Sequence, residues 1–278
     1  MAATKQSAGA GPVPFKDSAG AVPLITIVPG GRPSDPKLWV CCYQGTWVMA
    51  PHLPGIVSIQ QSFAPRRGDV VLASPPKCGT TWLKALAFAT MARGAYPPGD
   101  VERHPLSRLN PHDCVPFMEM LFADGSGSGK MDALPSPRLM ATHMHHSLLP
   151  PSIKENAGCK IIYICREPKD MVVSLWHFSR RARPDLAFSD TFEAACEGMS
   201  PNGPIWDHVL GYWNASKANP EKVLFLNPET GSGSLFGNDW YFRKGGVGDW
   251  MNHMTPDMAR RLDAIVDEKL RGSGLSFA

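Results

Sequence analysis

Several features that define protein classes are missing from this sequence or scarce in it. The seven cysteines are odd in number and show no Cys-x-x-Cys spacing, which argues against a disulfide framework and against a zinc site. No stretch reaches the roughly 18 apolar residues that a membrane span needs, and the N-terminus has no apolar segment after a basic start. The net charge of +3 is too small to indicate nucleic acid as a partner. We therefore expect a cytoplasmic protein that binds neither membranes nor nucleic acid.

What the sequence does contain is enough apolar material for one large core. With 278 residues, of which 43% are hydrophobic and 19% charged, the chain can form a single α/β domain. Residues 1–36 are rich in Ala, Gly, Pro and Ser, a composition that cannot bury enough apolar area to offset the entropy lost on ordering. We expect a flexible tail over 1–36 and one domain over 37–278.

Short apolar runs predict the strands of that domain, and longer periodic segments predict its helices. The predicted strands, which read as buried parallel strands, cover residues 70–73, 138–143, 159–165 and 221–226. The predicted helices cover residues 83–91, 171–181, 188–197, 205–218 and 256–270. Strands that alternate with helices indicate a three-layer α/β fold with a central parallel sheet. The Gly/Ser-rich stretch at 124–130 is expected to be a variable surface loop.

The connection between the first strand and its helix has the composition of a phosphate-binding loop. Gly79 permits a backbone conformation that other residues resist, and Thr80 and Thr81 offer hydroxyls and amides where the helix begins. A helix N-terminus carries unpaired N–H groups and about half a positive charge, and Lys77 adds a full charge. The pattern is not the Walker A motif, because no Gly-Lys-Ser/Thr closes the loop. These features favour a bound anion. The alternative is an ordinary strand-to-helix turn without a ligand, in which Lys77 is solvated.

Histidines follow the predicted strand at 138–143, at the edge where open α/β sheets place their chemistry. Three of them, His143, His145 and His146, fall within four positions. Adjacent residues point in different directions and no nearby carboxylate completes a ligand set, so a single histidine acting as a base is favoured over a metal site. His112 lies in the proline-rich connection at 95–116, where a capping or surface role is favoured over that of a base.

Arg166 and Ser174 suggest a second phosphate site. Arg166 lies at the carboxyl end of a predicted strand, and Ser174 lies one helical turn into the next element. A guanidinium binds phosphate through two parallel hydrogen bonds, so this pair can hold a phosphate group. The alternative is an Arg166 that pairs with Glu167 or Asp170 on the surface.

A third basic cluster lies near the C-terminus. Arg243 and Lys244 are followed by Gly245 and Gly246, so two charges lie beside exposed backbone N–H groups. This arrangement also suits phosphate. The three clusters together indicate a small polyanion as ligand.

In their order along the chain, these stretches resemble the plant-type cytosolic sulfotransferases. That family moves a sulfuryl group from 3′-phosphoadenosine 5′-phosphosulfate (PAPS) to an acceptor hydroxyl. The resemblance runs from about Trp47 to Phe277. It rests on residues 76–82, similar to the family's P-loop-like phosphosulfate loop, on residues 159–178, similar to its 3′-phosphate element, and on residues 243–245, similar to its C-terminal nucleotide loop.

The resemblance implies a role for each of these residues. Lys77 would stabilise the bridging oxygen as the leaving phosphate gains charge. His143 would remove the proton from the acceptor hydroxyl, which requires a neutral imidazole. The rest of the loop would contact the phosphosulfate and the nucleotide: Cys78, Gly79, Thr80, Thr81 and Trp82. The 3′-phosphate would be held by Arg166, Ser174, Arg243, Lys244 and Gly245. No metal is required, and the implied acceptor is a small flavonoid, steroid-like or jasmonate-like metabolite.

The sequence also departs from the family pattern. Cys78 stands where the family has serine, and Met144, His145 and His146 replace Leu-Pro-Tyr after the base. Ala141 stands where animal members carry a lysine. The three replacements after the base affect the acceptor pocket and the identity of the base. Cys78 is a mild change, because the phosphate loop works mainly through its backbone.

The largest departure is a missing segment around residues 227–239. The family continues after the last core strand with several tens of residues that include part of the adenine-binding wall, whereas this chain bridges directly to the C-terminal loop. A catalytically impaired nucleotide- or ligand-binding relative is therefore an alternative, while a nucleoside-kinase-like transferase is disfavoured by the absent Walker lysine. We expect a monomer or a weak homodimer.

Overall fold

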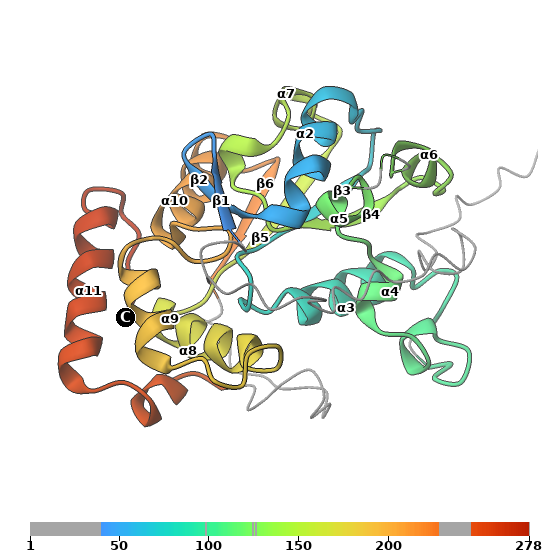
Figure 1. Ribbon diagram of the computed structural model, residues 1–278. Coiled ribbons are helices and arrows are strands. Elements are labelled where there is room, and N and C mark those ends of the chain that lie inside the picture. The colour runs from blue at the N-terminus through green and yellow to red at the C-terminus, as the bar shows by residue number, and fades with distance from the viewer. Residues whose placement is uncertain (1–39, 98, 124, 126, 228–245, 278) are drawn as a thin grey trace, which may run out of the picture.

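The fold is built on a four-stranded parallel sheet, as predicted (Figure 1). The computed structural model describes residues 40–97, 99–123, 125, 127–227 and 246–277. In spatial order the strands are β4 (Leu139–Thr142), β3 (Val70–Ala73), β5 (Lys160–Ile164) and β6 (Val223–Leu226). Because β4 and β5 lie on opposite sides of β3, the strand order reverses at the end of β3. This is the position where open α/β sheets bind ligands.

Helices cover both faces of the sheet and complete the predicted three layers (Figure 1). Leu72 packs on one face with Phe88 of α3, while Val71 and Tyr163 belong to the larger core on the other face. This division follows from the two-residue alternation of side chains along a strand. The α-helices are α2 (Leu53–Ser62), α3 (Thr80–Met91), α4 (Pro111–Cys114), α5 (Met118–Leu121), α6 (Gly127–Asp132), α7 (Pro151–Glu155), α8 (Pro168–Ser179), α9 (Phe188–Cys196), α10 (Ile205–Ala218) and α11 (Pro256–Leu270).

The described part of the chain also contains a hairpin and four short 3₁₀ turns. The hairpin joins β1 (Val40–Tyr43) to β2 (Thr46–Met49) through Gln44 and Gly45, both with positive φ, as two-residue hairpin turns require. The 3₁₀ turns are η2 (Ala50–His52), η3 (Pro105–Ser107), η4 (His146–Leu148) and η6 (Asp249–Asn252).

A buried ion pair fixes the register of the two strands that carry the phosphate loop and the histidines. Arg138 precedes β4 and Asp69 precedes β3, and their side chains, both fully buried, meet at 2.6 Å. The pair holds the amino ends of these strands level, so Ala73 at the end of β3 lies opposite Thr142 at the end of β4. The loop after β3 and His143 after β4 are thereby brought to the same edge.

Local sequence signals predicted most ends of the five expected helices correctly but missed α2 and the four short helices α4, α5, α6 and α7. The helix predicted at 205–218 has those bounds, and α11 begins after Thr255, whose side chain accepts the N–H of Met258. The surface loop predicted at 124–130 is wrong in its second half, because α6 begins at Gly127. Met131 of α6 is buried in the core, and this tertiary packing outweighs the low helix propensity of Gly and Ser.

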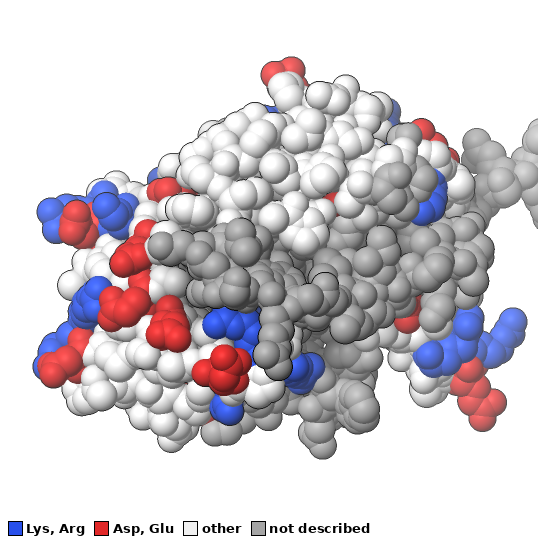
Figure 2. All heavy atoms as spheres, viewed as in Figure 1, with Lys and Arg blue, Asp and Glu red and all other residues white. Residues whose placement is uncertain are grey.

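Charges of both signs are mixed on the face that Figure 2 presents. Over α9 and α11, Arg261 pairs with Glu193 at 2.7 Å and Arg260 pairs with Asp257. Such a mixture differs from the single-sign basic surface that nucleic-acid-binding domains use. Among the described helices, none combines the length and the apolar character that crossing a bilayer demands.

Candidate active site

The loop between β3 and α3 has the backbone of an anion-binding turn. Lys77 (φ 68°) and Gly79 (φ 90°) both adopt left-handed conformations, and Gly79 is the N-cap of α3 with no side-chain cap. A left-handed lysine is uncommon and costs free energy, which is typical of functional sites. The side chains of Ser74 and Thr80 meet at 2.6 Å across the loop and hold it closed. The first N–H groups of α3 are thus presented to an anion rather than to a capping side chain.

Positive charge gathers at this loop. Burial lowers the pKa of Lys77, and the neighbouring cations Arg181 and Arg166 lower it further. The Nζ atom of Lys77 lies 4.4 Å from the centroid of the Phe178 ring. Two arginines that disfavour the charge of Lys77 form with it a positive site that a bound anion would stabilise.

Cys78 and Trp82 occupy different environments in the same segment. Cys78 is buried, and burial raises the pKa of its thiol to about 12, so it stays protonated at neutral pH. Trp82, by contrast, is 37% exposed on α3. Cys78 therefore acts as a packing residue in place of serine, while the indole of Trp82 is accessible from solvent.

His143 is held as a neutral imidazole at the end of β4. Its Nδ1 atom lies 2.8 Å from the carbonyl oxygen of Ser74. A carbonyl can only accept a hydrogen bond, so Nδ1 carries the proton and Nε2 keeps its lone pair. Burial lowers the pKa of His143 to about 4. The side chain is therefore a proton acceptor at neutral pH, directly attached to the phosphate loop.

Several groups fix the backbone on either side of this imidazole. Glu119 accepts the N–H of His143 at 2.7 Å and the hydroxyl of Thr142 at 2.9 Å. The carbonyl of His143 lies 3.0 Å from the amide nitrogen of Asn202 and 3.1 Å from Nε2 of His208. Both peptide groups of the base are thus anchored in the core.

A second buried network connects α3 to His112. The fully buried Nζ atom of Lys84 lies 3.0 Å from Nδ1 of His112, and Nε2 of His112 lies 3.1 Å from the hydroxyl of Thr81. Burial lowers the pKa of His112 to about 3 and lowers that of Lys84 well below its usual value. Phe117 lies at the centre of the group, with its ring stacked on His112 and 3.2 Å from Nζ of Lys84.

The structure corrects the interpretation of His112 and separates the three clustered histidines. His112 is neither a simple cap nor a surface residue, because its ring joins Lys84 to Thr81. His145 lies 3.0 Å from the carbonyl of Asn202, and His146 packs its ring against Tyr212. The three histidines after β4 thus face different partners, as adjacent residues were expected to do.

Arg166 forms the ion pair that the sequence left as an alternative, but not at the surface. Its guanidinium lies 3.3 Å from the carboxylate of Asp170, which is fully buried, and 3.3 Å from the carbonyl of Gly246. Asp170 also accepts the N–H groups of Gly248 and Trp250 at 2.8 and 3.0 Å. Ser174 lies one turn further along α8, half-buried. Arg243, Lys244 and Gly245 lie outside the described residues.

Four residues that shape this site were not predicted from the sequence. Glu119, Asn202 and His208 reach His143 from distant elements, and no sequence pattern around these residues predicts the contacts. Lys84 had a signal, because it lies four residues after Thr80 and three after Thr81, on the same face of the helix.

Known proteins share this combination of sequence and fold. A sequence model of the family described as "Sulfotransferase domain" matches residues 67–230 and 231–274. The chain belongs to the sulfotransferase family. Cytosolic sulfotransferase 12 of Arabidopsis thaliana is 37% identical over 287 aligned positions, which cover 85% of this chain and 87% of that protein. Cytosolic sulfotransferase 5 of the same plant is also 37% identical, over 91% of this chain and 95% of its own length.

Solved structures agree with this membership. A crystal structure of an Arabidopsis thaliana sulphotransferase matches with a TM-score of 0.72 at 37% identity, covering 90% of this chain and 94% of the other. Mouse sulfotransferase SULT7A1, in a crystal structure complexed with PAP, shares the fold with a TM-score of 0.65 at 24% identity, over 84% of this chain and 96% of its own. The prediction from the motifs, that the chain is related to the plant-type cytosolic sulfotransferases, is therefore confirmed.

The family match also bears on the predicted missing segment. It is divided between residues 230 and 231, within the stretch where the sequence departs from the family pattern. The alignment with cytosolic sulfotransferase 12 is 287 positions long but covers only 85% of this 278-residue chain. Several tens of positions in that relative therefore have no counterpart here.

Proposed function

We propose that this sulfotransferase transfers the sulfuryl group of PAPS to the hydroxyl of a small metabolite, with His143 as the base. The observation that carries the proposal is the 2.8 Å contact between Nδ1 of His143 and the carbonyl of Ser74. It leaves Nε2 as a proton acceptor and attaches the base to the loop that would hold the donor. Base and donor loop thus share one rigid edge of the sheet, which favours an aligned transfer.

The reaction requires one proton transfer and one change of bonding at sulfur. The acceptor oxygen forms a bond to sulfur as its proton passes to Nε2 of His143. The bond between sulfur and the bridging oxygen breaks, and its electron pair leaves with the bisphosphorylated nucleotide. Lys77 lies in the donor loop and stabilises the charge that develops on that oxygen. Its lowered pKa means that the ammonium group releases a proton more readily than a solvated lysine would.

Lys84 and His112 orient the hydroxyl of Thr81. If the Lys84 amine donates to Nδ1 of His112, the ring carries its proton on Nε2 and donates to Thr81. The Thr81 hydroxyl hydrogen is then directed away from the ring and is available to the phosphosulfate. Lys84 also supplies a buried amine on α3 in a site where Ala141 supplies none.

The nucleotide would be selected by its 3′-phosphate. Arg166 and Ser174 lie at the carboxyl end of β5 and on α8, and together with Arg243, Lys244 and Gly245 they are the residues that we assign to this group. Asp170 holds Arg166 in place at 3.3 Å without burying it, and the Arg166 side chain remains 25% exposed. An arginine that is positioned but accessible suits bidentate binding of a phosphate.

The acceptor that we propose is a hydroxylated flavonoid, steroid-like or jasmonate-like compound. The solved Arabidopsis relative is described as a candidate steroid sulphotransferase, which supports an apolar acceptor with one hydroxyl. The two Arabidopsis relatives bear the word cytosolic in their names, and we propose a cytoplasmic location for this chain, as a monomer or weak homodimer.

A second candidate function is favoured by the junction at residues 230 and 231. If the segment absent there completes the adenine wall, the chain would bind a nucleotide or an apolar ligand without turnover. The two functions share the phosphate loop and differ only in the product.

Calorimetric titration with adenosine 3′,5′-bisphosphate tests the proposal. We expect one binding site in the wild-type chain and none in a Lys77→Ala, Arg166→Ala double variant, while Arg93→Ala, which removes an exposed arginine beyond α3, binds normally. Sulfated product from a panel of flavonoid, steroid and jasmonate acceptors would then establish the enzyme. Binding without product would establish the second candidate in its nucleotide-binding form, and a folded wild-type chain that does not bind the bisphosphate would refute both that form and the sulfuryl transfer.

A further inference from the structure

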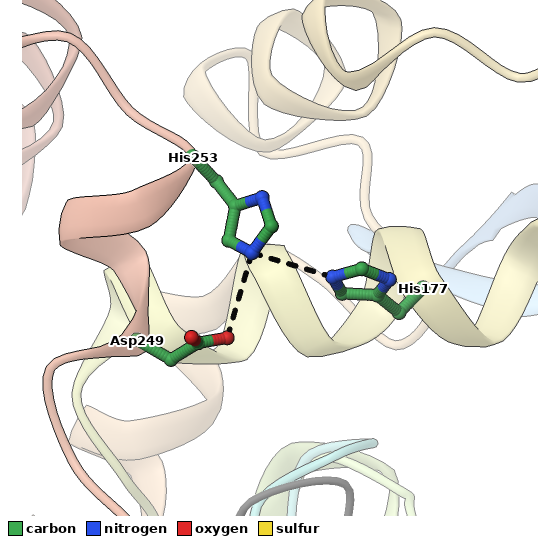
Figure 3. A group of neighbouring side chains, drawn as sticks. All are labelled: His177, Asp249 and His253. Atoms are coloured by element: carbon green, nitrogen blue, oxygen red, sulfur yellow. Dashed lines mark hydrogen bonds and ion pairs between the residues drawn. The ribbon is translucent and has the colours of Figure 1, made fainter.

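Two imidazoles and one carboxylate converge between α8 and η6, outside the residues assigned to sulfuryl transfer (Figure 3). His177 lies in the last turn of α8, Asp249 is the first residue of η6, and His253 follows that turn. We propose that these three side chains form a binding site for a divalent transition-metal ion of the zinc class. This inference does not depend on the proposed reaction.

The distances match those of a metal-ligand set. Nε2 of His177 lies 3.4 Å from Nε2 of His253, which lies 3.6 Å from Oδ2 of Asp249. Zinc bonds of about 2.0–2.1 Å in a tetrahedral site separate neighbouring ligand atoms by roughly 3.3–3.4 Å. All three ligand atoms lie within 4.8 Å of one another. Two of the three ligand-to-ligand distances are therefore already close to the tetrahedral value, and the third is no longer than 4.8 Å.

The backbone that presents these ligands is held rigidly. Asp170 accepts the N–H groups of Gly248 and Trp250 and so attaches η6 to α8. Asp170 lies two helical turns before His177, which places both side chains on one face of α8. Asp249 and His253 are four residues apart in the turn that Asp170 anchors. The ligands from the two elements thus meet because a separate buried carboxylate fixes the elements together.

The surroundings of the three side chains favour a cation. The carbonyl end of a 12-residue helix carries a partial negative charge, and His177 lies in the last turn of α8. The indole of Trp176 packs against both imidazoles, with ring centroids 4.5 and 5.6 Å away, and its own N–H donates to the carbonyl of Leu186. The Asn252 amide donates to the second oxygen of Asp249 at 3.0 Å and orients the carboxylate. Orientation of ligands by such outer contacts is a regular feature of metal sites.

A hydrogen-bonded chain of the three side chains is the alternative to a metal site. In that chain the Nε2 proton of His253 would go to either Asp249 or His177, since one N–H donates along one direction. In the structure Nε2 of His253 lies beside both Nε2 of His177 and Oδ2 of Asp249 (Figure 3), and a single N–H accounts for only one of these two contacts. Two nitrogens and one oxygen suit zinc, copper, nickel or iron(II), and they leave a coordination position for water or another ligand.

Cobalt(II) titration of the full chain, followed by displacement with zinc, tests the site. We expect one equivalent of cobalt to give visible d–d absorption without the strong near-ultraviolet band of cobalt–thiolate bonds, because the ligands are nitrogen and oxygen. In His253→Ala and Asp249→Asn the affinity should fall by about 10- to 100-fold or more. Two variants serve as matched controls: Met251→Ala, an exposed side chain of the same turn, and His104→Asn, which removes a histidine elsewhere but retains its N-terminal capping acceptor.

Circular dichroism in chelator distinguishes loss of the site from loss of the fold. A ligand variant that keeps the wild-type melting temperature in chelator, yet is no longer stabilised by zinc as the wild-type chain is, supports the proposal. Equal cobalt affinity in the wild-type chain and in both ligand variants would overturn it. So would a thiolate band, which would assign the metal to cysteine, or failure of the wild-type chain to bind.

Discussion

The site has two parts, the histidines near the phosphate loop and the arginine before α8, and the two parts hold their ionisable side chains in different ways. After β4 and on α4, burial keeps His143 and His112 neutral by lowering the pKa of each. At the start of α8, Arg166 keeps a buried carboxylate partner and remains partly exposed. The first half therefore offers proton acceptors in a rigid core, and the second offers a fixed charge at an accessible edge.

The difference separates chemistry from recognition. A general base works best when it is neutral and held at one angle, which the carbonyl of Ser74 provides for His143. A phosphate ligand is recognised by charge, which survives only where a partner or solvent stabilises it. Substitutions in the two halves should therefore change different kinetic constants.

The largest effect is expected for His143→Ala. Loss of the base should reduce turnover by about 10²- to 10⁴-fold and leave affinity for adenosine 3′,5′-bisphosphate almost unchanged, as measured by product formation and calorimetry. His104→Asn is the control for the loss of a histidine elsewhere. Normal turnover in His143→Ala would remove this residue from the mechanism and with it the proposed division of the site.

Removal of Arg166 should act on binding instead. A charge-assisted hydrogen bond contributes about 1.5–3 kcal/mol, so Arg166→Ala should weaken adenosine bisphosphate binding by roughly 10- to 150-fold. Turnover at saturating donor should change far less, and Arg93→Ala should match the wild-type chain. A large loss of turnover with unchanged affinity would show that Arg166 belongs to the chemical half.

Lys84→Met tests whether the buried lysine acts through Thr81. Methionine keeps the length of the side chain but cannot donate to His112, so the Thr81 hydroxyl loses its fixed orientation. We expect turnover to fall by about tenfold, the equivalent of one hydrogen bond of about 1.4 kcal/mol. Thr81→Val should cause a similar loss, and the double variant should be little worse than either single one. Additive losses would contradict a shared pathway.

Acidification should destabilise the fold before it removes the base. Burial lowers the pKa of His143, His145 and His146 to about 4 from an ordinary value of 6.5. Between these values the unfolded chain binds more protons, so the free energy of unfolding falls as pH decreases from 6.5 toward 4. Urea midpoints at pH 7.5, 6 and 5 should decrease in that order, with a shallower decline in His145→Gln. A constant midpoint would mean that these imidazoles are solvated.

The sequence by itself determined the structural elements that depend on residues close together in the chain. The strand at Val70–Ala73, the capping of α11 by Thr255 and the glycine-containing loop before α3 follow from patterns within a few positions. The order of the phosphate-binding stretches was enough to indicate the family. These features are local, and local chemistry decides them.

The tertiary structure alone decided which side chains meet. Glu119 of α5, His208 of α10 and Asn202 before α10 reach His143 from distant parts of the chain. His177 meets Asp249 and His253 because Asp170 attaches η6 to α8. Burial, which sets the pKa of each histidine, is likewise a property of the packed core. Contacts between residues far apart in the chain depend on how helices and strands pack, and no local pattern encodes that packing.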